Sequence, residues 1–248
     1  MVAKMLLNRR AFEAPFLDQG ERICRLPGLI VPPKAFSGRE GREASMPPYG
    51  QPQACDYISG EVYPPAEDTY LLLKAALAEA RPEDRAIEIG CGSGAIVREL
   101  SSVVQFLIAT DINPHALRAT RSRAPEIPLI RADLFRGIKG RFDLILFNPP
   151  YLPFNPEERS GKWIDRALDG GESGRETIER FLQELEDHLL AGGRALLLIS
   201  SLTGLPEVIE MACRLGMRAE TVLSERCFFE QLYVLRIWAE ERTGQKAR

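Results

Sequence analysis

From residue 59 onward, short runs of consecutive apolar residues alternate with longer segments in which apolar residues recur every three or four positions. The short runs are typical of strands buried on both faces, and the longer spacing is typical of amphipathic helices. Their alternation predicts an α/β fold with a parallel sheet covered by crossover helices. The expected strands span residues 86–89, 106–109, 128–130, 142–147, 194–200, 218–223 and 230–238.

The last two expected strands are joined by a short connection, which predicts that they pair antiparallel. Two consecutive antiparallel strands at the end of a parallel sheet depart from the doubly wound dinucleotide-binding fold. The pattern therefore predicts a mostly parallel sheet that ends in a C-terminal antiparallel strand pair.

The segments between the strands carry residues that begin or end helices. Proline, serine or asparagine before an apolar stripe marks a helix start, and glycine marks a helix end. Helix starts are expected after Pro64–Pro65, at Ser93, at Asn113–Pro114 and at the capping box Ser173-x-x-Glu176, with a stop at Gly192–Gly193. The first of these helices would bury Tyr70, Leu73 and Leu77 on one face and carry Glu67 and Asp68 near the positive end of its dipole. A later helix would bury a stripe made of Ile178, Phe181, Leu182 and Leu185.

Residues 1–58 differ from the rest of the chain, because they hold seven of its 18 prolines and only short apolar stretches. We interpret 1–58 as a Pro-rich N-terminal extension, 59–240 as the main domain and 241–248 as a polar tail. Residues 151–172 lack periodicity, and a loop of that length is typical of functional use. Trp163 in this loop is expected either to contact the substrate or to belong to the core.

The composition narrows the function classes. Among 248 residues, of which 45% are apolar, no apolar run approaches the roughly 20 residues that cross a bilayer. Asn8-Arg9-Arg10 interrupts the N-terminus before an apolar signal segment forms, so we expect a cytoplasmic protein. The net charge of −3 disfavours direct nucleic-acid binding. The five cysteines include no Cys-x-x-Cys pair and there are only two histidines, so we expect no metal site and reduced thiols.

Candidate chemistry begins with the turn Glu88-Ile89-Gly90-Cys91-Gly92-Ser93-Gly94, between an expected strand and an expected helix. Glycines let a ligand approach the backbone, and the helix N-terminus offers free N–H donors. Gly90, Gly92 and Ala95 also fit a loose dinucleotide fingerprint, with Asp111 placed to hold a ribose. This turn predicts a nucleotide-like ligand without identifying it.

A polar side chain stands at or just after the carboxyl end of each of four successive expected strands. These residues are Glu88, Asp111, Asp133 and Asn148. The carboxyl ends of parallel strands share one edge of the sheet, where open α/β folds bind their ligands. We therefore expect the four side chains to line one site.

Asn148-Pro149-Pro150-Tyr151 is the most specific motif in the chain. The Asn148 amide oxygen and the Pro149 carbonyl can both accept hydrogen bonds from one planar –NH₂ group, which would direct the nitrogen lone pair. Two prolines fix the backbone, and Tyr151 supplies a flat wall for a planar group. The motif predicts chemistry on a planar amine or amide.

Together, these motifs resemble the class I S-adenosylmethionine-dependent methyltransferases. More narrowly, the chain from about residue 60 to 238 resembles the archaeal and eukaryotic branch of the HemK/PrmC-like glutamine methyltransferases. The motifs that carry this resemblance are residues 62–69 (Val-Tyr-Pro-Pro-Ala-Glu-Asp-Thr), 147–151 (Phe-Asn-Pro-Pro-Tyr), Gly170-Gly171-x-x-Gly174-Arg175-Glu176 and Phe228-Phe229-Glu230. The resemblance implies a seven-stranded Rossmann-like sheet and methylation of the glutamine in the Gly-Gly-Gln loop of class I peptide-chain release factors.

The resemblance also implies roles for individual residues. The methionine part of S-adenosylmethionine would lie near Thr69, Glu88 and the glycine turn with Gly90 and Gly92, the ribose on Asp111, and the adenine on Asp133 and the Leu134 backbone. Asn148 and Pro149, supported by Pro150 and Tyr151, would hold the acceptor nitrogen. Members of this branch work with a small zinc-binding activator protein, for which the third strand, around residues 127–131, would offer a sheet edge.

Other functions compete with this interpretation. An exocyclic adenine amine of DNA or RNA presents the same –NH₂ geometry, and a basic strip could serve it: Arg118, Arg121, Arg123, Arg131, Arg136, Lys139 and Arg141. A nicotinamide oxidoreductase fits the glycine turn but leaves Asn148–Tyr151 unexplained. A cofactor-binding scaffold without catalysis is disfavoured by the intact tetrapeptide. Both His115 and His188 are interpreted as structural.

Overall fold

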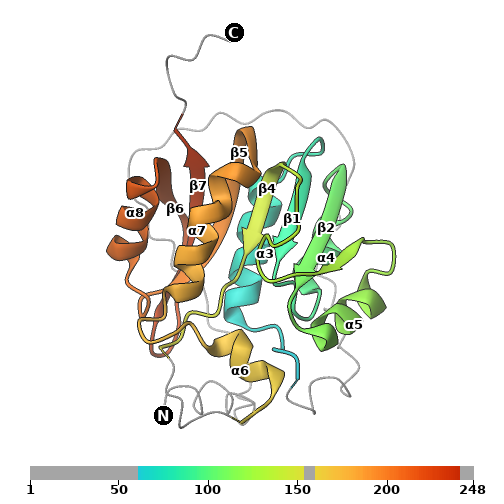
Figure 1. Cartoon of the computed structure of the whole chain (residues 1–248), viewed down its shortest axis with the longest axis horizontal. Coiled ribbons are helices and arrows are strands. Elements are labelled where there is room, and N and C mark those ends of the chain that lie inside the picture. The colour runs from blue at the N-terminus through green and yellow to red at the C-terminus, as the bar shows by residue number, and fades with distance from the viewer. Residues whose placement is uncertain (1–60, 154–159, 241–248) are drawn as a thin grey trace, which may run out of the picture. The chain divides into compact units, whose positions relative to one another are not determined.

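The computed structural model describes residues 61–153 and 160–240, and the expected extension and tail lie outside these ranges. A seven-stranded sheet runs through this part of the chain in the order β3-β2-β1-β4-β5-β7-β6 (Figure 1). The strands are β1 (Arg85–Ile89), β2 (Phe106–Asp111), β3 (Leu129–Arg131), β4 (Phe142–Phe147), β5 (Leu189–Ser200), β6 (Met217–Arg226) and β7 (Gln231–Ala239).

The first five strands are parallel, whereas β7 pairs antiparallel with both β5 and β6. The predicted α/β fold and its antiparallel C-terminal pair are therefore confirmed. The strand order also confirms that β3 lies at one edge of the sheet, and β6 forms the other.

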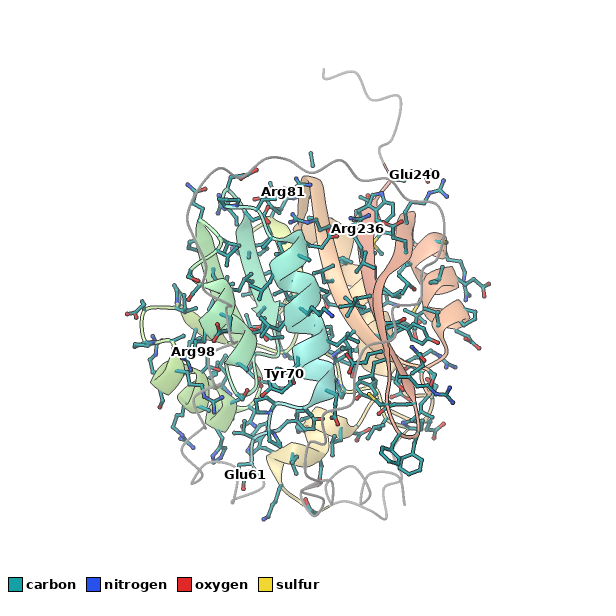
Figure 2. The ribbon with its side chains drawn as sticks, turned by 180° about the vertical axis from the view of Figure 1, so that it is seen from behind. Glu61, Tyr70, Arg81, Arg98, Arg236 and Glu240 are labelled. Atoms are coloured by element: carbon teal, nitrogen blue, oxygen red, sulfur yellow. The ribbon has the colours of Figure 1, made fainter. Side chains whose placement is uncertain are left out.

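Helices cover both faces of the sheet. They are α3 (Glu67–Glu79), α4 (Ala95–Leu100), α5 (Pro114–Arg123), α6 (Trp163–Leu168), α7 (Glu176–His188) and α8 (Leu205–Arg214). α7 and α8 lie in front of the sheet in Figure 1, and α3 and α4 lie in front in the reverse view of Figure 2. The small α6 lies beyond the strand ends, at the bottom of Figure 1.

The face toward α7 and α8 carries a continuous apolar core. Alternate residues of the central strands, such as Ile87 and Ile145, pack with the predicted α7 stripe, all of which is buried. The Phe181 ring lies against Phe135 and Phe147, with ring centroids 5.5 and 4.8 Å apart. This packing fixes the end of β4 that precedes Asn148.

A buried ion pair holds the opposite end of the sheet. Arg194 in β5 donates to Asp84, with 2.8 Å between Nη2 and Oδ2, and both side chains are almost fully buried. Arg194 also donates to the carbonyl oxygens of Asp143 and Glu79. One guanidinium thus connects β5, β4 and the C-terminus of α3.

The predicted apolar face of α3 is wrong in two of its three residues. Leu73 is buried, but Tyr70 and Leu77 are 42% and 44% exposed. The buried side of α3 instead contains Leu72, Ala75 and Ala76, and the two small alanine side chains let the helix approach the sheet closely.

Three predicted helix ends also differ from the structure, whereas Asn113 caps α5 as expected by accepting from the His115 N–H at 2.9 Å. α4 begins after Gly94 rather than with a Ser93 cap, because Gly94 takes a left-handed conformation. The helix expected at Ser173 begins only at Glu176, since a glycine-rich turn occupies 170–174. Gly192–Gly193 does not end α7 but lies inside β5.

Candidate active site

The carboxyl ends of β1, β2 and β4 bring the expected polar residues to one edge. Ile89 pairs with Thr110 on one side and with Phe147 on the other, so the next residues, Asp111 and Asn148, extend the same row. Figure 2 shows Glu61 and Tyr70 at this end of α3 and Arg81 at the far end. The structure therefore brings Glu88, Asp111 and Asn148 to one edge, as predicted from the strand ends.

The glycine turn needs its glycines for conformation and for space. Gly90, Gly92 and Gly94 all have positive φ, a backbone conformation that residues with a Cβ rarely adopt. A Cβ on Gly94 would lie 2.8 Å from the Thr120 Cα. The turn therefore holds α4 against α5 and leaves an open backbone next to Asp111.

Asp111 is fixed by backbone donors. Its Oδ2 accepts from the Gly92 N–H at 2.9 Å, and its Oδ1 accepts from the Asn113 N–H at 2.8 Å. Burial raises the pKa of the Asp111 carboxyl, and these hydrogen bonds partly offset that effect. A carboxylate oriented in this way suits a hydroxyl donor such as a ribose diol.

Glu88 is a deeply buried acid of the site. Burial first, and then the negative charge of Asp111, raise the pKa of Glu88 well above its usual range. Its Oε2 is buried and accepts no hydrogen bond from any residue that the structure describes. A buried acceptor without a donor indicates a position where a ligand donates or carries positive charge.

The Asn148 side chain is oriented by Asp68, an acid in the first turn of α3 that was expected to favour the helix dipole. Its Nδ2 donates to Asp68 Oδ2 at 3.1 Å. Its Oδ1 is buried and has no hydrogen-bond donor within the described ranges. Because an ionised carboxylate only accepts, Asp68 fixes the amide with its oxygen as the available acceptor.

Asp68 is itself held by neighbours in the first turn of α3. Its carboxylate accepts from the Thr69 N–H at 2.6 Å and from the side chains of Thr69 and Tyr63. Burial raises the Asp68 pKa, and these hydrogen bonds oppose the shift. The motif 62–69 in the sequence pointed to Asp68. Its contact with Asn148, 80 residues later, could not be predicted from the sequence.

The glycines of 170–174 pack directly on the tetrapeptide 148–151. A Cβ on Gly174 would lie 2.5 Å from the Tyr151 carbonyl oxygen, and a Cβ on Gly170 would lie 2.9 Å from that of Pro150. Leu152 also exchanges backbone hydrogen bonds with Leu168 and Gly170. This glycine motif therefore supports the backbone that follows Asn148.

Asp133 lies closer to the surface than the other acids and pairs with a residue not identified from the sequence. Arg180 of α7 donates to Asp133 Oδ2 at 2.8 Å. The next residue, Leu134, has φ of 50°, the positive-φ conformation that non-glycine residues rarely adopt. The strained Leu134 turns the backbone at the point where the adenine is expected.

The aperiodic segment 151–172 contains the short helix α6. Trp163 at its start is half-buried; its backbone N–H donates to Glu61 Oε2 at 3.2 Å, and Arg166 lies over its ring. The Glu61 carbonyl in turn accepts from Asn113 Nδ2 at 2.7 Å. Trp163 therefore lies outside the main core, in a segment anchored next to the site.

Most arginines of the expected basic strip are used in local structure. Arg121 donates to the carbonyls of Pro125 and Ile127, Arg131 to that of Ile112, and Arg141 to that of Leu189. These contacts join helix ends and turns rather than form one phosphate-binding row.

Within the described ranges, no group of three or more His, Cys, Asp or Glu side chains has the geometry to hold a metal ion, and no helix is long and apolar enough to cross a membrane.

Comparison with known proteins supports the interpretation of this edge. Residues 67–161 match the family model of the methyltransferase small domain. The chain is 39% identical over 183 residues to a putative protein N5-glutamine methyltransferase of Methanocaldococcus jannaschii, covering 72% of this chain and 92% of that protein. The chain belongs to the HemK/PrmC-like glutamine methyltransferases. It is also 34% identical over 190 residues to the human methyltransferase HEMK2, covering 71% and 89% of the two chains.

A solved structure agrees with this family. The E. cuniculi Mtq2–Trm112 complex, described as responsible for methylation of the eRF1 translation termination factor, matches with a TM-score of 0.61 and 27% identity. The match covers 73% of this chain and 99% of that one. The predicted class I methyltransferase fold and N-methyltransferase activity are thereby confirmed, and neither an oxidoreductase nor a scaffold without catalysis is supported.

Proposed function

We propose that this enzyme transfers a methyl group from S-adenosylmethionine to the side-chain amide nitrogen of the glutamine in the Gly-Gly-Gln loop of a class I release factor. The observation that carries this proposal is the Asn148 amide, whose Nδ2 is bound by Asp68 and whose buried Oδ1 lacks a donor among the described residues. Such an acceptor fits the –NH₂ group of a glutamine. The names of the Methanocaldococcus protein, a putative protein N5-glutamine methyltransferase, and of the E. cuniculi complex, which methylates eRF1, support the same substrate class.

The residues at the strand ends fit the cofactor. Asp111 would accept from the ribose hydroxyls, and Glu88 Oε2, which lacks a donor, would face the positively charged methionine part near Thr69. Gly90 and Gly92 would let this ligand lie against the backbone. Asp133, whose other oxygen is paired with Arg180, and the Leu134 N–H would hold the adenine.

The reaction needs a nitrogen lone pair aimed at the methyl carbon. S-adenosylmethionine supplies a sulfonium methyl group; the nitrogen–carbon bond forms as the carbon–sulfur bond breaks, and the sulfur keeps the electron pair. Asn148 Oδ1 and the Pro149 carbonyl would accept from the two amide hydrogens and stabilise the positive charge that develops on nitrogen. The proton then leaves to water. Positioning by Asn148, Pro149 and the Tyr151 ring carries the rate, without a strong base.

Adenine methylation is the alternative function, and no observation favours it over glutamine methylation. Incubation with labelled S-adenosylmethionine and either a release factor or an adenine-containing oligonucleotide separates the two. Label in the protein alone supports the proposal, whereas label in the oligonucleotide alone refutes it. The cofactor site has its own test: Asp111→Ala should weaken binding in calorimetry by about 1.5–3 kcal/mol, because a charged acceptor is lost.

We also propose a small activator subunit as partner. The complex of Mtq2 with Trm112 supports it, as does the β3 edge, where Ile130 is 38% exposed. Co-expression with the activator should increase soluble, active enzyme. If the enzyme alone is monodisperse and gains no activity from the activator, the partner proposal is wrong. Aggregation after deletion of 1–58 would then show that the N-terminal extension covers the β3 edge. An enzyme that modifies translation factors would work in the cytoplasm.

A further inference from the structure

The turn between β6 and β7 presents two neighbouring aromatic rings to solvent. Phe228 is 95% exposed and Phe229 is 65% exposed, and their ring centroids lie 5.9 Å apart. Every other large apolar side chain described as exposed is at most 44% exposed. Two adjacent exposed phenylalanines are unfavourable in water unless another molecule covers them.

The turn lies at the same sheet edge as the active site. Ser200, the last residue of β5, pairs with Leu232 near the start of β7, so the preceding residues extend past the carboxyl end of β5. Figure 1 shows the β6–β7 turn and α6 at the same end of the sheet. β4, which precedes Asn148, is two strands from β7, a separation of about 10 Å at the usual strand spacing.

Hydrogen bonds to the end of β5 hold the turn in place. The Ser200 hydroxyl donates to the buried Glu230 carboxylate at 2.5 Å, and the Cys227 N–H donates to the Glu230 carbonyl at 2.8 Å. The Ser201 N–H donates to the Gln231 carbonyl at 2.7 Å. The two rings are therefore displayed on a fixed base rather than on a loose loop, and a rigid display limits the entropy lost on binding.

A chain of contacts links this base to the catalytic backbone. Arg175 donates to the Thr203 carbonyl at 2.6 Å, in the loop that follows Ser200. The neighbouring Gly174 packs against the Tyr151 carbonyl. Leu202, 40% exposed, lies in the same loop. Contacts thus connect the backbone of the tetrapeptide to the base of the phenylalanine pair.

From this geometry we infer that Phe228 and Phe229 form a docking site for the protein substrate, contacting an apolar surface of the release factor next to its target glutamine. The inference rests on the proposed function. A substrate whose glutamine enters at Asn148 must cover this edge of the sheet, and the rings lie at the same edge, on the turn next to β7. Exposed aromatic residues with a rigid base are typical anchors of protein interfaces. The activator proposed above would instead bind at β3, at the far edge of the sheet.

The test compares the double variant Phe228→Ser/Phe229→Ser with the control Phe106→Ser. Phe106 is also an exposed aromatic, 40% exposed, but it lies at the amino end of β2, away from the site. KM and kcat are measured with a full-length release factor, and its Kd is measured in the presence of S-adenosylhomocysteine. We expect KM and Kd to rise at least tenfold in the double variant, with kcat at saturation and cofactor affinity unchanged, and no change in the control.

Several results would overturn the docking site. Unchanged KM and Kd in the double variant would show that the substrate does not contact the rings. A fall in kcat with constant KM would show that the turn shapes the active site instead. A wild-type dimer that the double variant converts to an active monomer with unchanged KM would assign the rings to self-association. If the wild type binds S-adenosylmethionine but methylates no release factor, the proposed function fails, and the docking site fails with it.

Discussion

Replacement of Asp68 by alanine tests how the acceptor amide is oriented. Asp68 accepts from Asn148 Nδ2 at 3.1 Å in a buried environment, so this hydrogen bond joins a neutral amide donor to a charged carboxylate acceptor. Such bonds contribute about 1.5–3 kcal/mol. Without this bond the Asn148 amide can turn and present Nδ2, a donor, to the –NH₂ group of the substrate. We expect kcat to fall roughly 10- to 150-fold, the range that this free energy gives at about 1.4 kcal/mol per factor of ten.

Steady-state kinetics with a release factor would measure this loss, while calorimetry checks that affinity for S-adenosylmethionine is kept. Asp68→Asn should recover part of the rate, because its side-chain oxygen can still accept from Asn148. Glu67→Ala is the matched control, since Glu67 is an exposed acid in the same helical turn. A kcat of the Asp68→Ala enzyme equal to that of the wild type would refute the positioning role, as would an equal loss in the Glu67→Ala control.

Two predictions concern stability. Because burial raises the pKa of Glu88, the native state binds this proton more tightly than the unfolded state, and the free energy of unfolding should fall as the pH rises from about 4.5 through the raised pKa. Glu88→Gln should remove that contribution and unfold at higher urea concentration than the wild type at pH 7.5 without cofactor; an unchanged or lower midpoint contradicts it. Arg194→Met leaves the buried Asp84 carboxylate unpaired and should lower the free energy of unfolding by about 3–5 kcal/mol, with kcat retained at 25 °C. A loss below 1 kcal/mol in denaturant titration would show that the pair contributes little.

The predictable part of this protein is what short-range patterns encode. Short apolar runs predicted all seven strands. The polar residues at the ends of these runs, Glu88, Asp111 and Asn148, could be assigned to one site because parallel strands share their carboxyl edge. The Asn113 cap followed from two adjacent residues.

The remainder depends on contacts between distant segments. Asp68 and Asn148 are 80 residues apart, and Asp133 and Arg180 are 47 apart, so no local spacing predicts either pair. Tyr70 and Leu77 fit an apolar stripe, but tertiary packing placed Leu72 and Ala76 against the sheet instead. The glycines of 170–174 displaced the expected capping box because Gly170 and Gly174 pack on the backbone of Pro150 and Tyr151.

The central claim is that Asn148 holds a glutamine amide for methyl transfer. The most direct measurement is tandem mass spectrometry of a release factor after incubation with S-adenosylmethionine and either the wild-type or the Asn148→Ala enzyme. We predict that the wild type adds one methyl group to the side chain of the glutamine in the Gly-Gly-Gln loop. The variant should be slower by about 10²–10³, as expected when a hydrogen bond to the transition state is lost, and should keep its cofactor affinity. A methyl group found at another residue, or a variant as fast as the wild type, would contradict the claim.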